Sequence, residues 1–406
     1  MNTATSTIEQ LPPAGSSTVE SFLQELVRIP SVNPPGNEGP VAELMARKLS
    51  ALGFHTQIVE SAPGRANLVA TLTGTGGGPR LILNGHMDVQ PAANGWSVDP
   101  FGGEIKDGSL YGRGSMDMKA GLAAAVFGIE QLIRQGKKFS GDLIVAAVAD
   151  EVCGGHLGTG FLIREGYLKG DFAVICEPTG QQVNVAHRGA LWLEIEIAGK
   201  SAHGGRPWLG VNAVSKMAAI ITAIEQKMLP SLSNRVHRLL PTPTINLGTI
   251  AGGTKFNMVA DRCVLQVDRR LVPGETVAKV KSEFEDLCET VRQSDHEQFL
   301  VTVREVMSVP PSEISEDAPI VQECVRAFQQ VTGEAPAIGC TAGFEDAHFF
   351  INAGIPAAMF GPYRRNPPNV RFYSNSGGPD EHVRLDDLQT AVRVYAQLID
   401  NLVCAR

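Results

Sequence analysis

Apolar residues recur at helical spacing in several stretches of the chain. In residues 18–29 they are Val19, Phe22, Leu23, Leu26 and Val27, which line one face of an amphipathic helix. The same period predicts helices over residues 41–52, 118–134, 319–332, 346–352 and 385–403. Residues 1–16, rich in Ser, Thr, Pro and Ala, are expected to form a loose tail.

Short apolar runs alternate with these helices and predict strands over residues 56–59, 67–72, 81–83, 143–148, 172–176 and 357–360. The runs at 143–148 and 172–176 are continuously apolar, as is typical of strands covered on both faces. Three strands are followed closely by polar groups, namely His86, Asp150 with Glu151, and Glu177. Because ligands bind at the carboxyl edge of α/β sheets, we expect an α/β fold with a mostly parallel sheet flanked by helices and a site along that edge.

The pattern changes near residue 183. Strands at 185–197, 244–250, 263–267 and 299–306, with helices at 211–227 and 275–291, follow the order β-α-β-β-α-β of a ferredoxin-like α+β domain. A chain of 406 residues also suits two domains better than one. We therefore predict a catalytic domain in two parts, residues 1–182 and 302–406, with an inserted domain at 183–301.

The composition of the chain limits the classes of partner and the cellular compartment that we expect. The formal charge of −8 argues against nucleic acid as a partner. No apolar run approaches the ~20 residues that cross a bilayer, so no membrane partner is expected. The N-terminus lacks the basic and apolar segments of a secretory signal, which predicts a cytoplasmic protein. The seven cysteines are scattered and form no C-x-x-C pair, so we expect reduced thiols.

Three side chains at the predicted sheet edge suit a metal ion. His86, Asp117 and Glu177 offer one nitrogen and two carboxylates, a set that fits Zn²⁺, Mn²⁺ or Co²⁺. Asp88 lies two residues after His86 and could accept the second ring N–H of the imidazole. Glu151 is a candidate general base beside the metal, although an acid in a loop can simply be solvated.

These residues lie in motifs that carry a family resemblance. GHMDVQP, YGRGSMDMKAG, ADEVCGG and CEPTG occur in this order, followed by GKSAHGGRPWLGVNA, GTIAGGTKFNMVAD, VDRRLVPGE and GIPAAMFGP. Together they resemble the aminoacylase and carboxypeptidase family of metal-dependent amidohydrolases, which includes acetylornithine deacetylase, succinyl-diaminopimelate desuccinylase and glutamate carboxypeptidase. The resemblance covers nearly the whole chain and implies a metallopeptidase-like fold whose inserted domain acts as lid and dimerisation domain.

The resemblance also implies roles for single residues. His86, Asp117 and Glu177 match the ligands of the first metal, with Asp117 in the bridging position, while Asp88 matches the acid that orients the histidine and Glu151 the general base. His203 is similar to a histidine that reaches the partner's active site in a homodimer and stabilises the oxyanion. Asn257 and Arg270 match positions that bind the substrate's carbonyl and carboxylate. Without the resemblance, His203 would be read as a loop histidine and Arg270 as a surface ion-pair former.

Two positions depart from the family pattern, and both concern the second metal. Relatives have Asp-Glu-Glu where this chain has Val152 after Glu151, and a histidine where this chain has Gly377. Because both ligands of one ion are missing, we predict a single, comparatively labile metal ion per subunit. A rebuilt second site stays open, since several possible ligands lie near the right segments: His156, Glu345, Asp346, His348 and His382.

The segment after FGP is also unusual for the family. It contributes Tyr363, Arg364, Arg365, Arg371 and Tyr373. Either it is a solvated turn, or it forms a wall of the substrate pocket with cations for a carboxylate and rings for stacking.

The function implied is metal-dependent hydrolysis of a C–N bond in a small carboxylate-bearing substrate, such as an N-acyl amino acid or a short peptide. The altered metal site keeps a second chemistry open, the release of ammonia from an activated aromatic amino acid of the nitro-anthranilate type. A third possibility is a non-catalytic binding protein derived from the family. It is opposed by the retained Glu151 and the three retained ligands of the first metal.

Overall fold

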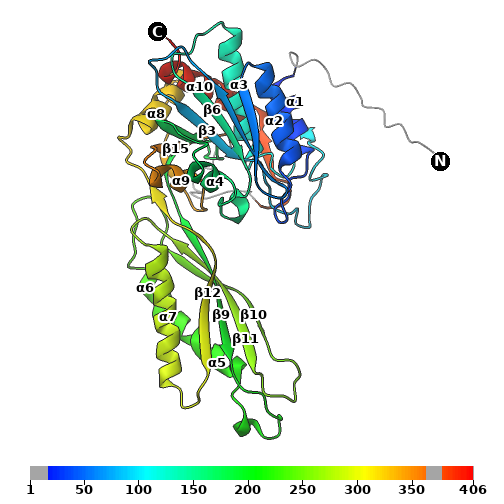
Figure 1. The fold of residues 1–406 in the computed structure, drawn as a ribbon, viewed down its shortest axis with the longest axis vertical. Coiled ribbons are helices and arrows are strands. Elements are labelled where there is room, and N and C mark those ends of the chain that lie inside the picture. The colour runs from blue at the N-terminus through cyan, green and yellow to red at the C-terminus, as the bar shows by residue number, and fades with distance from the viewer. Residues whose placement is uncertain (1–16, 363–376, 406) are drawn as a thin grey trace, which may run out of the picture.

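A computed structural model describes residues 17–362 and 377–405 of the chain. Figure 1 shows two bodies, a layered body that holds both ends of the described chain and an elongated one below it. The predicted pocket segment from Tyr363 to Tyr373 lies outside the described residues.

The layered body is built on a nine-stranded sheet with the order β1-β2-β6-β3-β7-β15-β8-β13, and β14 pairs with β8. Its centre is parallel, since β3 pairs in parallel with both β6 and β7, and β15 pairs in parallel with β7. The strands are β1 His55–Ala62, β2 Arg65–Leu72, β3 Leu81–His86, β6 Leu143–Val148, β7 Phe172–Ile175, β8 Val183–His187, β13 Ser312–Glu313, β14 Ile338–Thr341 and β15 Ala357–Met359. The α/β prediction is confirmed.

Helices cover both faces of this sheet. The main core packs one face against α1 Val19–Val27, α2 Gly39–Ala51, α3 Lys119–Arg134, α8 Pro319–Thr332 and α10 Leu385–Leu402. A smaller core packs the other face, through Ile82 and Ile144, against α4 Thr159–Arg164 and α9 Ala347–Asn352. The alternating burial of Leu81, Ile82 and Leu83 into these two cores explains why the first half of β3 is apolar on both faces.

The elongated body is a four-stranded antiparallel sheet with the order β10-β11-β9-β12. Its elements are β9 Gly189–Ala198, α5 Ala213–Ala223, α6 Leu229–Leu232, β10 Thr244–Gly252, β11 Arg262–Leu271, α7 Val277–Ser294 and β12 Leu300–Val309. Alternate residues of β9, among them Leu191 and Leu193, pack with α5 and α7 in a core of their own. We call this body the lid. Its sheet runs from residue 189 to 309, whereas the sequence suggested 183–301, because β8 pairs within the large sheet.

Five short strands were not predicted, and two of them, β13 and β14, join the large sheet. The other three lack an apolar run. They are β4 Ile105–Lys106, β5 Ser109–Tyr111 and β16 His382–Arg384, and they form a small sheet with the order β16-β5-β4. The pairing of β16 with β5 brings the segment before the last helix against the loop that leads to Asp117.

Neither membrane helices nor disulfides occur in the described part of the chain. No helix there is long and apolar enough to span a bilayer. All seven cysteines are free thiols, as predicted.

A buried ion pair joins helices α2 and α3. Lys48 Nζ on α2 donates to Glu130 Oε2 on α3 at 2.6 Å, and both side chains are almost fully buried. The second Glu130 oxygen accepts from Arg134, whose side chain is largely exposed. We expect Lys48→Met to lower the free energy of unfolding by about 3 kcal/mol, because it leaves a buried carboxylate with only a solvated partner.

Denaturant unfolding of the two matched variants tests this expectation. Arg134→Met removes the exposed partner of the same carboxylate and should cost under ~1 kcal/mol. Equal losses in the two variants would contradict the assignment of the larger cost to burial.

Candidate metal centre

Three predicted metal ligands meet at the carboxyl edge of the central strands. His86 ends β3, Asp117 lies two residues before α3, and Glu177 follows β7. His86 Nε2 lies 3.0 Å from Asp117 Oδ1 and 3.6 Å from Glu177 Oε1. One donor atom from each of the three lies within 4.8 Å of the others, and among the described residues this is the one group of its kind. The arrangement therefore suits a single divalent ion.

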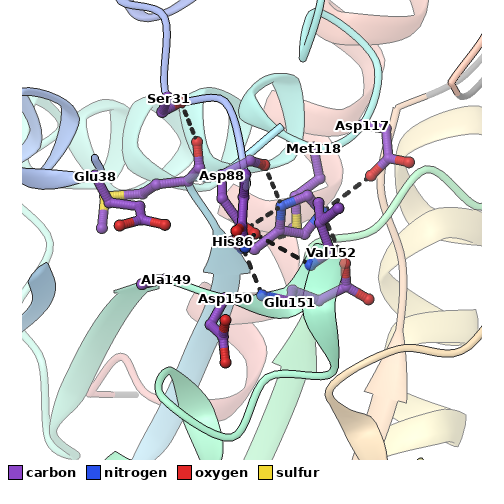
Figure 2. A network of polar contacts seen from close by, with 12 residues as sticks. Ser31, Glu38, His86, Asp88, Asp117, Met118, Ala149, Asp150, Glu151 and Val152 are labelled. Carbon is purple, nitrogen blue, oxygen red and sulfur yellow. Dashed lines mark hydrogen bonds and ion pairs between the residues drawn. The ribbon is translucent and has the colours of Figure 1, made fainter. Parts of the chain in front are cut away.

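Asp88 holds the site in a different way from the one predicted. We expected its carboxylate to accept the second ring N–H of His86, but Nδ1 contacts the Asp88 main-chain oxygen at 2.7 Å and the carboxylate at 3.6 Å. The carboxylate instead accepts from the backbone N–H groups of Glu151 and Val152 and from Asn33 Nδ2, at 3.2, 3.1 and 2.8 Å. Figure 2 shows Asp88 between His86 and the turn that carries Glu151. Asp88 thus ties the imidazole to that turn.

Glu151 projects from this turn toward the metal ligands. Its Oε2 lies 3.7 Å from His86 Nε2, and Figure 2 shows its side chain extending past Val152. The preceding residue, Asp150, has φ of 75°, which is unusual for a residue other than glycine. Arg65 pairs with Asp150 at 3.2 Å and with Glu38 at 2.7 Å. The turn is therefore fixed by buried ionic contacts on the side away from the site.

Electrostatics at the site favour a bound cation. Burial raises the pKa of Glu151 and of Glu177 well above the usual value, and the charge of His86 offsets this only in part. Burial lowers the pKa of His86, but the carboxylates of Glu151 and Glu177 raise it by more, so the net shift is well upward. More negative charge is gathered than one imidazolium can balance, and a divalent ion relieves that excess.

Sequence reasoning missed Glu381, which supports the metal loop from the far end of the chain. Its Oε1 accepts from the backbone N–H groups of Gly114, Met116 and Asp117 at 2.9, 3.0 and 3.1 Å. Its Oε2 accepts from Arg113 Nη1 at 2.6 Å, and both side chains are buried. The motif Pro-Asp-Glu around position 381 was used only to locate the missing histidine, although an acid there was the available signal.

We expect Glu381→Gln to weaken metal binding by about tenfold or more, because groups that hold the ligands in place have effects of this size. An amide cannot accept from three N–H groups and a guanidinium with the strength of a carboxylate. Calorimetric titration with Zn²⁺ measures the change. Asp386→Asn, which removes an exposed acid paired with Arg384, serves as the control. Equal affinity in wild type and Glu381→Gln would contradict this support role.

The two positions that depart from the family pattern carry no metal-ligating side chain. Val152 follows Glu151 in the turn, and Gly377 has φ of 76° and lies against Gln90. Two of the five possible substitute ligands have ring contacts elsewhere: His156 Nε2 contacts the Ser308 carbonyl, and His382 stacks on Tyr111. His348 Nδ1 contacts the Glu345 carbonyl, and its Nε2 is buried without a partner in the described structure. Asp346 accepts from Thr159 at 2.6 Å, and Glu345 Oε2 has no partner among the described residues.

The predicted substrate residues separate into two places. His203 and Asn257 lie together at the outer end of the lid, where Gly204 N–H donates to the Asn257 carbonyl at 2.9 Å and both side chains are exposed. Arg270 lies at the inner end, because it pairs with Ala190 at the start of β9. The ten residues of β9 separate these ends by about 30 Å, at ~3.3 Å per residue. One chain cannot bring all three to the same substrate in this arrangement.

Two arginines, Arg188 and Arg270, lie near the inner end of the lid, and Arg270 is paired with Asp268 at 3.0 Å. The guanidinium of Arg270 lies 5.7 Å from the ring centroid of Phe344, next to Glu345 in the chain. Arg188 is buried within electrostatic range of Arg270, donates to the carbonyls of Pro241 and Thr242, and has no partner for Nε in the described structure. Sequence reasoning missed Arg188, which is a single arginine in an otherwise apolar strand connection.

Comparison with known proteins places this geometry in a family. The family model described as peptidase family M20/M25/M40 matches residues 82–401. The chain belongs to peptidase family M20/M25/M40. This match spans the central strands of the large sheet, the lid and the metal ligands, and it confirms the resemblance read from the motifs.

Relatives of the M20/M25/M40 chain share its length and fold. It is 30% identical over 410 residues to acetylornithine deacetylase of Proteus mirabilis, covering 96% of this chain and 97% of that one. It is 27% identical over 412 residues to succinyl-diaminopimelate desuccinylase of Gluconacetobacter diazotrophicus, covering 97% and 99%. The M20 family metallo-carboxypeptidase Sso-CP2 of Sulfolobus solfataricus superposes with a TM-score of 0.76 at 20% identity, covering 95% and 99%.

Membership of this family identifies the type of reaction that the chain catalyses. The chain is a metal-dependent hydrolase that acts on carbon–nitrogen bonds, as predicted. The residues at the sheet edge fit a metal, because His86, Asp117 and Glu177 supply donors that suit a divalent transition metal. The raised pKa values of His86 and Glu177 agree with an excess of negative charge there.

Proposed function

We propose that the protein hydrolyses the amide bond of a small carboxylate-bearing substrate, an N-acyl amino acid or a short peptide. The observation that carries the proposal is the position of the Glu151 carboxylate, 3.7 Å from the imidazole of a three-residue metal-donor group. The divalent ion, Zn²⁺, Mn²⁺ or Co²⁺, would be held by His86, Asp117 and Glu177. When bound it supplies Lewis acidity to the scissile carbonyl and acidifies water.

Residues of the chain supply the proton transfers and the orientation. Glu151 takes the proton of the attacking water and returns it to the leaving nitrogen. Asp88 keeps His86 and Glu151 in fixed relation through its backbone and carboxylate contacts. Arg270, with Arg188 beside it, binds the substrate carboxylate at the inner end of the lid. Burial of His86, Asp88 and Glu151 strengthens their interactions relative to water.

We also propose a single ion per subunit. Val152 and Gly377 offer no ligand atom in their side chains, and the described residues hold one group of metal donors, His86, Asp117 and Glu177. Metal analysis of the purified protein after dialysis tests this, with about one ion per chain expected. Two ions per chain would overturn the single-ion proposal.

The lid supports a homodimer. Around His203 and Asn257 lie exposed apolar side chains: Trp208 is 73% exposed, Phe256 98% and Leu209 55%. Such a patch is typical of an interaction surface, and a second copy docked there could place His203 and Asn257 over the partner's metal centre to stabilise the oxyanion and bind the carbonyl. Sedimentation of wild type and Phe256→Asp tests this, with a dimer expected only for wild type.

We further propose a cytoplasmic location for the enzyme. Free thiols at all seven cysteines are usual where glutathione and thioredoxin keep them reduced. Fractionation of the native host, with the chain found in the cytosol, is the test.

Substrate assays decide between the predicted chemistries. A panel of N-acyl amino acids and dipeptides, followed by acid or amine release, is expected to show turnover that requires Glu151. Nitro-substituted aminobenzoates, followed by ammonia release, are the parallel assay. Turnover confined to the aminobenzoates would show that the substrate is the aromatic amine and not an amide. If no substrate showed turnover that depends on Glu151, the protein would be a non-catalytic binding protein.

A further inference from the structure

Arg65 is a buried arginine that lies behind the turn that carries Glu151. It is the first residue of β2, and its exposed fraction is 8%. Its Nε and Nη2 donate to the two carboxylate oxygens of Glu38 at 3.1 and 2.7 Å. Glu38 is fully buried, and Figure 2 shows it on the side of Asp88 away from Asp117. This paired contact fixes the plane of the guanidinium and leaves Nη1 for other partners.

The first partner of Nη1 is Asp150, the residue before Glu151. Nη1 lies 3.2 Å from Asp150 Oδ1, and Asp150 Oδ2 accepts from the backbone N–H of Leu157 at 2.9 Å. Among the described residues, Arg65 is the one cation in ion-pair contact with Asp150. The φ of Asp150 is 75°, a left-handed conformation that persists outside glycine only when its surroundings hold it. Arg65 therefore supplies one of the two side-chain contacts that hold this conformation.

The second partner of Nη1 is Asn33, which leads to a metal ligand. Nη1 donates to Asn33 Oδ1 at 3.5 Å, and Asn33 Nδ2 donates to Asp88 Oδ2 at 2.8 Å. Asp88 in turn contacts His86 through its main-chain oxygen and the backbone N–H of Glu151 through its carboxylate. These side chains are all more than nine-tenths buried, so water competes little for the contacts. Buried hydrogen bonds thus connect one guanidinium to both functional groups.

We propose that Arg65 is a positioning residue that holds the general base Glu151 and the metal ligand His86 in fixed relation. Its hydrogen bonds and ion pairs in the described structure go to other side chains, so it acts on both through the two routes described above. The inference rests on the proposed function for the role of Glu151 as base. A displacement of a catalytic group by ~1 Å is enough to slow a reaction severely. Loss of Arg65 should therefore lower kcat, while KM should change little.

The first experiment measures the turn itself, with no substrate present. Hydrogen–deuterium exchange is followed by mass spectrometry in peptides that cover residues 149–158, where the N–H groups of Glu151 and Val152 are hydrogen-bonded. Arg65→Gln should exchange there about tenfold faster or more, because it loses hydrogen bonds of a charged group that oppose local opening. Lys48→Met breaks another buried ion pair, away from the turn, and should leave this exchange at the wild-type rate.

A double variant separates positioning from stability. Arg65→Gln leaves Glu38 as an unpaired buried carboxylate, which by itself destabilises the fold. Glu38→Gln combined with Arg65→Gln removes that charge, so the free energy of unfolding should recover. Asp150 still lacks its cation in the double variant, so exchange over residues 149–158 should stay fast. Arg65→Lys keeps the charge without the planar fork and should give an intermediate rate.

Kinetics on the N-acyl amino acid that the wild type cleaves best give the functional result. In Arg65→Gln and in the double variant, kcat should fall by about tenfold or more with KM unchanged, as is usual when a supporting contact of a site is lost. The same substitution in a Glu151→Gln background should cost little further, because a base that has been removed cannot be misplaced. Lys48→Met should keep the wild-type kcat.

Three results would overturn the inference. They are wild-type exchange over residues 149–158 in the folded double variant, equally fast exchange there in Lys48→Met, and an equal loss of kcat from Arg65→Gln with and without Glu151. The exchange experiment needs no turnover. Fast exchange in a protein that hydrolyses no amide would support the positioning of the turn by Arg65 and contradict the proposed function alone.

Discussion

Replacing Glu151 with glutamine is expected to lower kcat by about 10²–10⁴-fold, the usual contribution of a positioned general base. The amide keeps the shape of the side chain, which lies 3.7 Å from His86, but cannot accept the proton of the attacking water. Metal content should stay at the wild-type level because the three ligands are untouched. Steady-state kinetics on whichever N-acyl amino acid the wild type cleaves best measures the change.

Glu165→Gln is the control for this variant, since Glu165 is an exposed acid paired only with its neighbour Arg164. It should leave kcat and KM unchanged. A kcat for Glu151→Gln within about tenfold of wild type would remove Glu151 from the role of general base. A fall in KM together with kcat would instead indicate that glutamine relieves strain in the bound substrate.

His86→Ala is expected to abolish both metal binding and turnover. The imidazole is the one nitrogen donor of the group and lies 3.0 Å from Asp117. Without it, the remaining carboxylates have only water to complete the coordination of an ion, which leaves a much weaker site. Metal content after dialysis and turnover on the same substrate are measured together.

His55→Ala provides the comparison, because His55 is an exposed residue at the start of β1, away from the metal ligands. It should keep its metal and full activity. Stoichiometric metal in dialysed His86→Ala would show that the ion is held elsewhere, and the donor group described above would then not be the metal centre.

The residues at the strand ends could be predicted because a strand that is covered on both faces needs a continuous apolar run. Residues 143–148 and 172–176 are apolar on both faces of a covered sheet, so the polar groups that follow them had to emerge at its edge. His86 and Glu177 were found in this way, and Asp117 from the helix that follows it. The lid followed from the alternation in β9, whose apolar residues face α5 and α7.

The remaining site residues could not be found by pattern. Glu381 lies in a loop with no period, and its importance comes from burial and from partners more than 200 residues away in the chain. Asp88 was identified correctly as a neighbour of His86, but spacing alone cannot tell a main-chain oxygen from a carboxylate oxygen as the acceptor. The separation of His203 from Arg270 depends on the length and direction of β9, which motifs do not encode.

The support of the Asp117 loop by Glu381 has a consequence for how the protein matures. Glu381 lies 264 residues after Asp117, and β16 closes on β5 from the same late segment. During synthesis the loop stays open until almost the entire polypeptide has left the ribosome, and such distant pairings form slowly. Nascent or C-terminally truncated chains that lack Glu381 should therefore bind the ion more weakly than the 406-residue chain.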